Sequence, residues 1–379
     1  MKQFKILFLV FLLLISLTSC MPQNTDIKKR LVIEGIGLDF DKETEMYELT
    51  VQVLETSSAD AQQGKSSTPV ANYTVKGKTV ARAIRSLGEN TGKYPLYSQN
   101  RIIVIGETLS GEQMIKALNF FVREYTSRPD VFVAAASGRA SDVLTVSAGG
   151  EIPAKLIESA IEQSNENSVS VNTELYEAVN ISLEETTCIT LPLIEVTDDR
   201  IPEEKTVKVT GTRACPEDVQ SSMLSDTETT ALLFITDKVN TGTLSVSNEK
   251  LTAALEIISS STKTSVGYEN GRFVFCIDVD CKADIVEFDS AVFDAVSEQD
   301  VKDLEIFAEK YIQSGMNGLL DRFIKEEGCD IFRFGKRIEQ KYPSLYRDFL
   351  NDSKNLTENT VFDVNVNIQI GRIGEMTMN

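Results

Sequence analysis

The stretch that most constrains the fold runs from residue 102 to residue 136. It opens with the unbroken apolar run Ile102–Ile105 and closes with a second one, Val131–Ala136. Such runs are typical of parallel strands buried on both faces. Between them, Ser110 and Gln113 form a capping-box pattern, which predicts the start of a helix. This order predicts a right-handed βαβ crossover and a mixed α/β (α+β) fold class. The inward face of the helix is expected to hold four apolar residues: Ile115, Leu118, Phe121 and Val122.

Apolar periodicity elsewhere predicts further strands and one long helix. Leu31–Leu38 and Tyr47–Glu55 have the composition of two strands joined by an acidic loop. Ser297–Glu327 carries an apolar face at helical spacing, with a possible bend at its glycines. The segment 362–370 alternates strictly between apolar and polar residues. It therefore predicts a half-buried terminal strand, which we expect to be antiparallel to its neighbour.

The chain divides into four segments on these patterns. Residues 1–20 are predicted to be a lipoprotein signal peptide, and residues 21–138 an N-terminal α/β domain that contains the βαβ unit. Residues 139–205 are predicted to be a mainly helical middle domain, which ends in the charged linker Asp198–Lys205. Residues 206–379 are predicted to be a C-terminal α/β domain with the long helix and the terminal antiparallel strand.

The first twenty residues have the features of a targeting segment. Lys2 and Lys5 precede an apolar block from Ile6 to Leu17. Twelve helical residues span about 18 Å, which is too short to cross a hydrocarbon core of about 30 Å. The block is followed by Leu17-Thr-Ser-Cys20, the pattern of a bacterial lipobox. We therefore predict that Cys20 carries a diacylglycerol thioether and an N-acyl chain; the alternative is an ordinary secretory signal with a chance cysteine.

The charge and the missing residue types exclude several classes of function. The chain has 38 basic and 57 acidic residues, a formal charge of -19, and no His. Without His it cannot form a Ser-His-Asp triad, a Cys-His pair or an imidazole metal site. Its negative charge opposes phosphate backbones and anionic lipid headgroups, so nucleic acid is not an expected partner.

The cysteines after residue 20 are odd in number: Cys188, Cys215, Cys276, Cys281 and Cys329. At least one thiol must therefore be unpaired within the chain. The spacing of Cys276 and Cys281 places their side chains on opposite faces of a continuous strand. Burial in the core is the expected role of all five.

Three motifs have the spacing of a binding or catalytic site, and each has a simpler explanation. Residues 59–66 fit a relaxed Walker A pattern, but Pro69 and β-branched residues follow where a helix should start, so a hairpin loop is the better interpretation. Asp39, Asp41, Glu43 and Glu45 have the spacing of a cation-binding loop but lack its glycine and flanking helices. Asp278 and Asp280 share a strand face, where a solvated surface is the expected outcome. We predict no catalytic residue, no cofactor site and no metal site.

Three stretches in the right order carry a resemblance to a known family. They are Leu31–Glu55 close behind the lipobox, Tyr97–Gly138, and Asp330–Arg372. Together with the elements between them, they make the chain resemble the Ger(x)C family, the lipoprotein C subunits of bacterial spore germinant receptors.

The resemblance implies a fold of three domains, each of mixed β-sheets packed with helices, and a non-catalytic role. It implies a lipid-anchored protein on the outer face of the spore inner membrane, beside membrane-embedded A-type and B-type receptor subunits. Such a subunit would act in receptor assembly and in coupling nutrients to germination. Two alternatives stay open: a lipid-anchored solute-binding protein that captures the germinant in an apolar pocket, and an enzyme that uses carboxylates such as Asp278 and Asp280.

Overall fold

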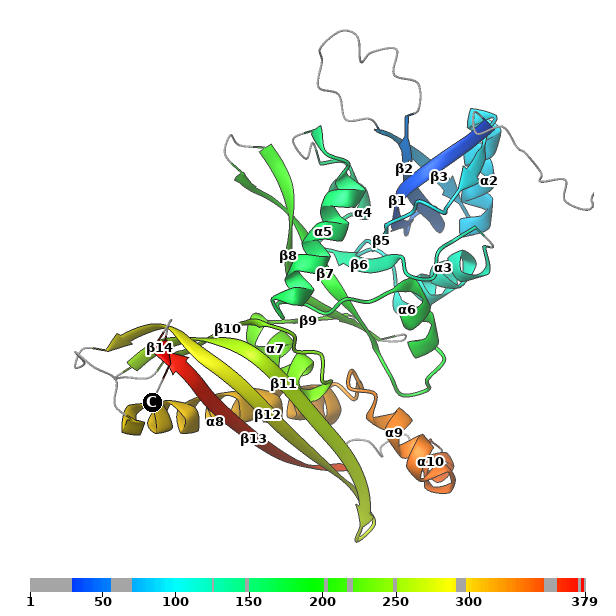
Figure 1. Cartoon of the computed structure of the whole chain (residues 1–379). Helices are drawn as coiled ribbons and strands as arrows, with labels where there is room; N and C mark the ends of the chain where they lie inside the picture. The colour runs from blue at the N-terminus through cyan, green and yellow to red at the C-terminus, as the bar shows by residue number, and fades with distance from the viewer. Residues whose placement is uncertain are drawn as a thin grey trace, which may run out of the picture.

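The computed structural model describes ten ranges of the chain. These are residues 29–55, 70–124, 126–146, 150–200, 204–216, 221–247, 251–290, 298–350, 360–373 and 376–377. They form two lobes, each built on one mixed β-sheet with helices against it (Figure 1). Within these ranges, no helix is long and apolar enough to cross a bilayer. The predicted mixed α/β class is confirmed.

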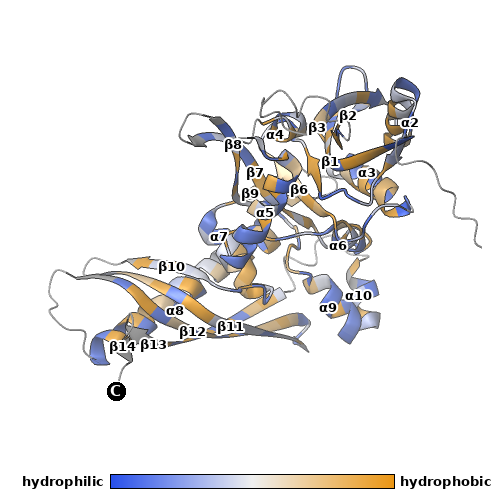
Figure 2. Cartoon of the chain, turned by 45° about the horizontal axis from the view of Figure 1, so that its top comes forward, coloured by the Kyte–Doolittle hydropathy of each residue, from blue (hydrophilic) through white to orange (hydrophobic). Residues whose placement is uncertain are grey.

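The first lobe is built on a nine-stranded sheet with the order β3-β2-β1-β5-β6-β7-β8-β9 and with β4 beside β1. The neighbours β1, β5, β6 and β7 run parallel, as does β4 beside β1, whereas β2, β3, β8 and β9 each pair antiparallel with their neighbours. Figure 2 shows much of β1 in the hydrophobic colour, and residues 31–39 of this strand are all buried, as burial on both faces requires. The strands are β1 Arg30–Asp41, β2 Met46–Leu54, β3 Val70–Gly77, β4 Tyr94–Leu96, β5 Ile102–Ile105, β6 Phe132–Ala136, β7 Ile189–Arg200, β8 Glu204–Cys215 and β9 Ser222–Leu224.

Helices contribute to the cores of this lobe, in two separate clusters. Buried residues of α2 (Val80–Thr91), α3 (Gly111–Arg123) and α6 (Leu175–Ile181) share one cluster. Those of α4 (Ala140–Leu144) and α5 (Pro153–Glu166) share the other. The helices α4 and α5 pack tightly on β1. A Cβ added to Gly35 of β1 would lie only 2.9 Å from Ala154 Cβ, so the close contact requires glycine at this position.

The predicted βαβ unit is confirmed as β5-α3-β6. The two strands pair in parallel, and Ser110 and Gln113 form both bonds of a capping box at the start of α3. One predicted inward residue is wrong: Val122 is 40% exposed, and the helix buries Met114 and Ala117 beside Leu118 and Phe121. The buried face therefore lies further towards the N-terminal turn than the sequence pattern indicated.

The second lobe is built on a five-stranded sheet with the order β10-β11-β12-β13-β14. Buried residues of α7, α8 and α9 and of the π-helix that follows α8 form one core with this sheet. The predicted long helix is confirmed and passes Gly315 and Gly318 without interruption. The elements are α7 Asp226–Ile235, β10 Gly242–Ser247, β11 Leu251–Glu269, β12 Arg272–Ser290, α8 Glu298–Leu320, the π-helix Asp321–Glu326, α9 Phe334–Lys341, α10 Pro343–Leu350, β13 Thr360–Ile373 and β14 Met376–Thr377.

The predicted direction of the terminal strand is wrong. β13 pairs in parallel with β12, from Phe273 opposite Thr360 to Ile285 opposite Ile373; only the two-residue β14 is antiparallel to it. The reason is the connection, since α8 and the helices after it bring the chain back to the start of β12 before β13 begins. The outer edge of β13 is covered by α8, whose Glu309 and Glu305 accept from Ile368 N at 3.1 Å and Ile370 N at 2.8 Å.

The described part of the segment 139–205 lies in the first lobe. The helices α4, α5 and α6 of that segment pack on the first sheet, to which β7 belongs. The described ends of the expected linker Asp198–Lys205 belong to strands, since β7 runs to Arg200 and β8 begins at Glu204, which pairs with it. The described strands thus lie in two sheets, and the short helices of this segment bury their apolar faces against the first of them.

Candidate functional site at the carboxyl edge of the parallel strands

The parallel strands β1, β5 and β6 end at one edge of the first sheet, where ligand sites of open α/β sheets commonly lie. Asp39–Asp41 form the end of β1, and the segments that follow β5 and β6 hold Gly106–Ser110 and Ser137–Ala140. Phe40 N donates to Thr108 Oγ1 at 2.8 Å and so joins the first two segments. The edge carries a polar network and, beside it, a groove.

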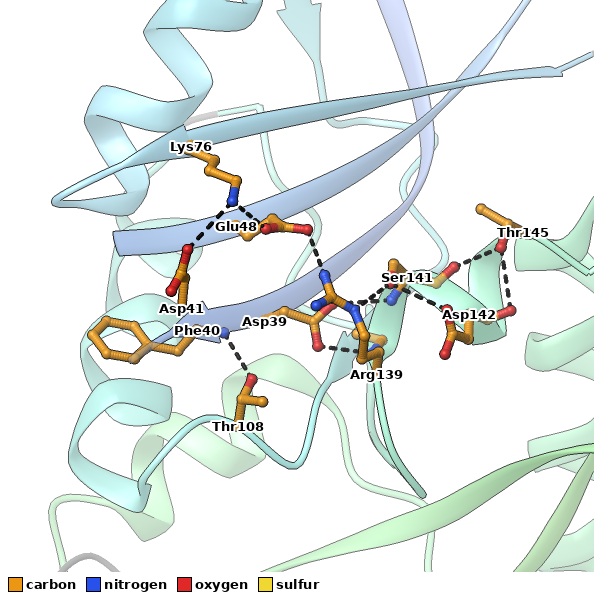
Figure 3. A network of polar contacts seen from close by, with 11 residues as sticks. Asp39, Phe40, Asp41, Glu48, Lys76, Thr108, Arg139, Ser141, Asp142 and Thr145 are labelled. Atoms are coloured by element: carbon orange, nitrogen blue, oxygen red, sulfur yellow. Dashed lines mark hydrogen bonds and ion pairs between the residues drawn. The ribbon is translucent and has the colours of Figure 1, made fainter. Parts of the chain in front are cut away.

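The network is centred on the buried carboxylate of Asp39, which is 2% exposed (Figure 3). Its two oxygens accept from Ala140 N at 3.0 Å and Ser141 N at 3.1 Å, at the start of α4. Burial raises the pKa of Asp39, while these two backbone donors act in the opposite direction. A Cβ on Gly106 would lie 2.1 Å from Asp39 Oδ1, so the carboxylate occupies space that only glycine leaves open.

Ion pairs extend this network across β1, β2 and β3. Lys76 Nζ lies 2.8 Å from Glu48 Oε2 and 3.4 Å from Asp41 Oδ2, and Arg139 pairs with Glu48. The hydrogen bond from Lys76 lowers the pKa of Glu48. Each carboxylate of the network therefore already has a cation or a backbone donor as partner. In the described ranges no three acidic or thiol groups are placed to hold a metal ion.

A groove of about 1460 Å³ lies at the same edge. One wall is aromatic, where Phe40 and Tyr47 pack edge to face with 5.4 Å between ring centroids. Arg213 from β8 also lines the groove; its guanidinium lies 2.9 Å from Glu107 Oε1 and donates to Ala136 O at 3.1 Å. The exposed lysines Lys42 and Lys78 also line it. The groove thus combines apolar and charged surfaces.

The groups in this groove are suited to binding rather than to nucleophilic chemistry. Burial raises the pKa of the Cys215 thiol to about 12, so this thiol is protonated at neutral pH. Burial likewise raises the pKa of Tyr47, whose hydroxyl donates to Gln113 O at 3.2 Å. With Arg213 paired to Glu107, none of these side chains is an activated nucleophile with an adjacent base.

The predicted site residues have different outcomes. Cys20 and the Walker-like segment 59–66 lie outside the described residues. Asp278 and Asp280 accept from the amides of Asn365 and Asn367, each at 3.1 Å, rather than facing a second acidic pair. They therefore belong to a polar sheet face, as the simpler interpretation held.

The cysteines agree with the sequence-based expectation of an unpaired thiol. Cys188 and Cys329 form a disulfide with 6.0 Å between their Cα atoms, while Cys215, Cys276 and Cys281 are free. Cys281 is buried and Cys276 is half-buried, so they do lie on opposite faces of β12. The disulfide joins the two lobes, which the spacing along the chain did not reveal.

Sequence reasoning missed Asp330, which is fully buried where the lobes meet. Its carboxylate accepts from Phe332 N at 3.0 Å and Gly335 N at 2.8 Å, and its carbonyl accepts from Cys188 N at 2.9 Å. Burial raises its pKa to about 6. The sequence does contain a signal for this role. Asp330 stands two residues before Phe332 and five before Gly335, and an aspartate so placed can accept hydrogen bonds from the backbone of the turn that follows it.

Comparison with known proteins gave two family matches that together span most of the chain. The family described as "Spore germination protein N-terminal domain" matches residues 23–196. The family described as "Spore germination B3/ GerAC like, C-terminal" matches residues 217–374.

Curated relatives and a solved structure agree with those matches. Spore germination protein B3 of Bacillus subtilis (strain 168) is 23% identical over 373 residues, which is 96% of either chain. Spore germination protein A3 of the same organism is 26% identical over 277 residues, 71% of this chain and 70% of that one. The crystal structure of the GerBC protein has a TM-score of 0.58 at 20% identity and covers 88% of this chain and 97% of its own. That likeness confirms the fold.

Proposed function

Because the chain belongs to the Ger(x)C family of spore germination proteins, we propose that it is a non-catalytic, lipid-anchored subunit of a germinant receptor. In this role it assembles with the membrane-embedded A-type and B-type subunits and couples nutrient detection to germination. The observation that carries the proposal is the pair of family matches, at residues 23–196 and 217–374.

The anchor in this proposal is Cys20 in its lipobox, which holds the protein at the outer face of the spore inner membrane. A single acyl chain binds a membrane only marginally, whereas two chains anchor a protein stably. The diacylglycerol thioether proposed at Cys20 supplies two acyl chains. Tethering confines the lobes near their partners and raises their effective concentration without any new contact. A surface so placed stabilises whichever receptor state it binds more tightly.

The contacts between the lobes support a coupling role. The Cys188–Cys329 disulfide lies beside the ion pair between Arg333 and Glu184. A force on one lobe is therefore transmitted to the other through covalent and charged contacts. The groove at the first sheet is open and amphipathic, which suits contact with a polypeptide.

The decisive test replaces Cys20 by Ala in the native host. We expect the variant to be lost from the spore inner membrane and nutrient-triggered germination to fall to the rate of a strain that lacks the protein. Cys276→Ala is the matched control, because this half-buried thiol is free and its loss leaves the lipobox intact. Membrane retention and a normal nutrient response in Cys20→Ala spores would show that the tether has no role.

The solute-binding alternative requires an enclosed apolar pocket that buries most of a small ligand. The groove is much larger than a typical pocket of about 300–1,000 Å³ and has charged walls. Isothermal calorimetry of the purified protein with amino acids, sugars and bile acids distinguishes the two functions. We expect no saturable heat, and a stoichiometric heat with one of them would favour the alternative.

A further inference from the structure

Within the described part of the chain, no helix lies against one face of the five-stranded sheet. The other face packs its apolar residues against α7, α8 and α9, and in Figure 1 α8 passes behind the strands. Alternation along β11, β12 and β13 leaves most of the first face to polar side chains; the row Gly267–Val274–Val361 is its apolar exception. We call this face the open face; its central registered rows are Ser265–Cys276–Asp363, Lys263–Asp278–Asn365, Ser261–Asp280–Asn367, Ser259–Lys282–Gln369 and Glu256–Asp284.

The open face is negatively charged. Its five central rows hold two lysines, Lys263 and Lys282, and five acidic residues: Asp278, Asp280, Asp284, Asp363 and Glu256. The amides of Asn365 and Asn367 hold the carboxylates of Asp278 and Asp280 in place at 3.1 Å. A carboxylate that accepts one amide bond retains lone pairs for another donor. The acceptors are thus positioned before any partner arrives.

One end of the open face also offers apolar surface. Ile258 is 52% exposed and Val286 is 50% exposed, at places where bulges shift the register of β11 and β12. Exposed aliphatic side chains beside ordered charges are typical of a protein contact surface rather than of a solvated face.

The charge decides which occupant fits. Phosphate backbones and anionic lipid headgroups would be repelled by the five carboxylates. A second copy of the same face would bring like charges together. A polypeptide rich in Lys and Arg can instead donate charge-assisted hydrogen bonds along the row of carboxylates.

We propose that the open face docks a basic polypeptide segment of a neighbouring receptor subunit; this inference rests on the proposed function. The segment places its cations over Asp278 and Asp280 and its apolar side chains near Ile258 and Val286. Because the contact is electrostatic and close to solvent, its strength falls as salt is added.

The test is photo-crosslinking of the full chain in spores of its own host. A benzoylphenylalanine placed at Asn367 reports on the open face, and one at Asp303, exposed on α8, is the control. We expect the probe at position 367 to crosslink to a receptor subunit through a peptide of net positive charge. Asp278→Lys with Asp280→Lys should lower that yield by about tenfold or more.

Matched variants separate charge from folding. Asp303→Lys with Glu326→Lys makes the same change of charge on exposed residues elsewhere and should leave the yield within about twofold. Asp278→Asn with Asp280→Asn keeps the shape of the strands and should give an intermediate loss. Far-UV circular dichroism of each variant checks that the lobe is folded.

Three results would overturn the docking proposal: no crosslink from position 367, a crosslink to a peptide of net negative charge or to a second copy, or an equal loss in the control pair. A probe at Lys42, beside the groove, separates a failure of the docking proposal from a failure of the proposed function. If it crosslinks to receptor subunits while position 367 does not, the subunit role stands and the open face is not the contact. Absence of crosslinks from both positions, with normal germination of spores that lack the protein, would refute the function itself.

Discussion

Replacing Asp330 by Ala tests whether a single buried carboxylate holds the junction between the lobes. In the native chain this side chain accepts from Phe332 N at 3.0 Å and from Gly335 N at 2.8 Å, and so fixes the turn that begins α9. Alanine leaves both buried donors without this acceptor. At about 1–3 kcal/mol for each, the loss at pH 7 is roughly 2–6 kcal/mol in the free energy of unfolding.

The same residue predicts how this loss varies with pH. Burial raises the pKa of Asp330 from 3.8 to about 6, so the folded state binds its proton more tightly than the unfolded chain does. The stability that this proton adds is fully present below pH 3.8 and is lost as the pH rises through about 6. The native chain should therefore gain about 1 kcal/mol in the free energy of unfolding when the pH falls from 7 to 5, and the alanine variant, which has no carboxyl at this position, should not gain it. The cost of Asp330→Ala should therefore be about 1 kcal/mol larger at pH 5 than at pH 7.

Urea unfolding of the purified protein at both pH values measures the two effects. The chain has no Trp, so tyrosine fluorescence and far-UV circular dichroism are the signals. Asp330→Asn, which keeps one acceptor oxygen and does not titrate, should lose less stability than alanine but show the same pH trend. Asp348→Ala removes an exposed carboxylate and is the control. A loss below 1 kcal/mol at pH 7 would refute the capping argument, and an equal loss at both pH values would refute the role given to burial.

Two further changes test the second lobe and its attachment to the first. Phe275→Ala removes a fully buried ring that packs 4.4 Å from Phe334 and 5.9 Å from Phe362 between centroids, and should cost about 3–5 kcal/mol in urea unfolding; a cost below 1 kcal/mol would contradict this packing. Cys188→Ser opens a disulfide that spans 141 residues, so we expect a loss of several kcal/mol, up to about 5. Alkylation of the unfolded, unreduced protein followed by mass spectrometry should find three modified cysteines after residue 20 in the native chain and four in the variant; five in the native chain would show that the bond is absent.

Local patterns were sufficient wherever neighbours along the chain decide the outcome. The capping box at Ser110 and the apolar runs around it predicted β5-α3-β6, because helix starts and strand burial depend on residues a few positions apart. Strict alternation in 362–370 predicted a half-buried strand, since the side-chain period of a strand is two. The lipobox at Cys20 is likewise a contiguous motif.

The candidate site could not be assembled from the sequence, because its parts are far apart along it. The groove brings Phe40 and Tyr47 together with Arg213, from three strands of one sheet. The polar network joins Asp39 to the start of α4 across about a hundred residues. No spacing rule connects such positions, since only strand order places them at one edge.

The sequence by itself determined the chain's acidic charge, its lack of imidazole chemistry, the class of its elements and the predicted anchor at Cys20. The tertiary structure decided that β13 is parallel to β12, that the helices of 139–205 share the first sheet, and that Asp330 is buried between lobes. The physical reason is that hydrophobic periodicity reports which face of an element is covered. The direction of that element, its neighbours in the sheet and the extent of its burial depend on contacts between segments that are distant in the sequence. These contacts stabilise the fold only after the segments have come together.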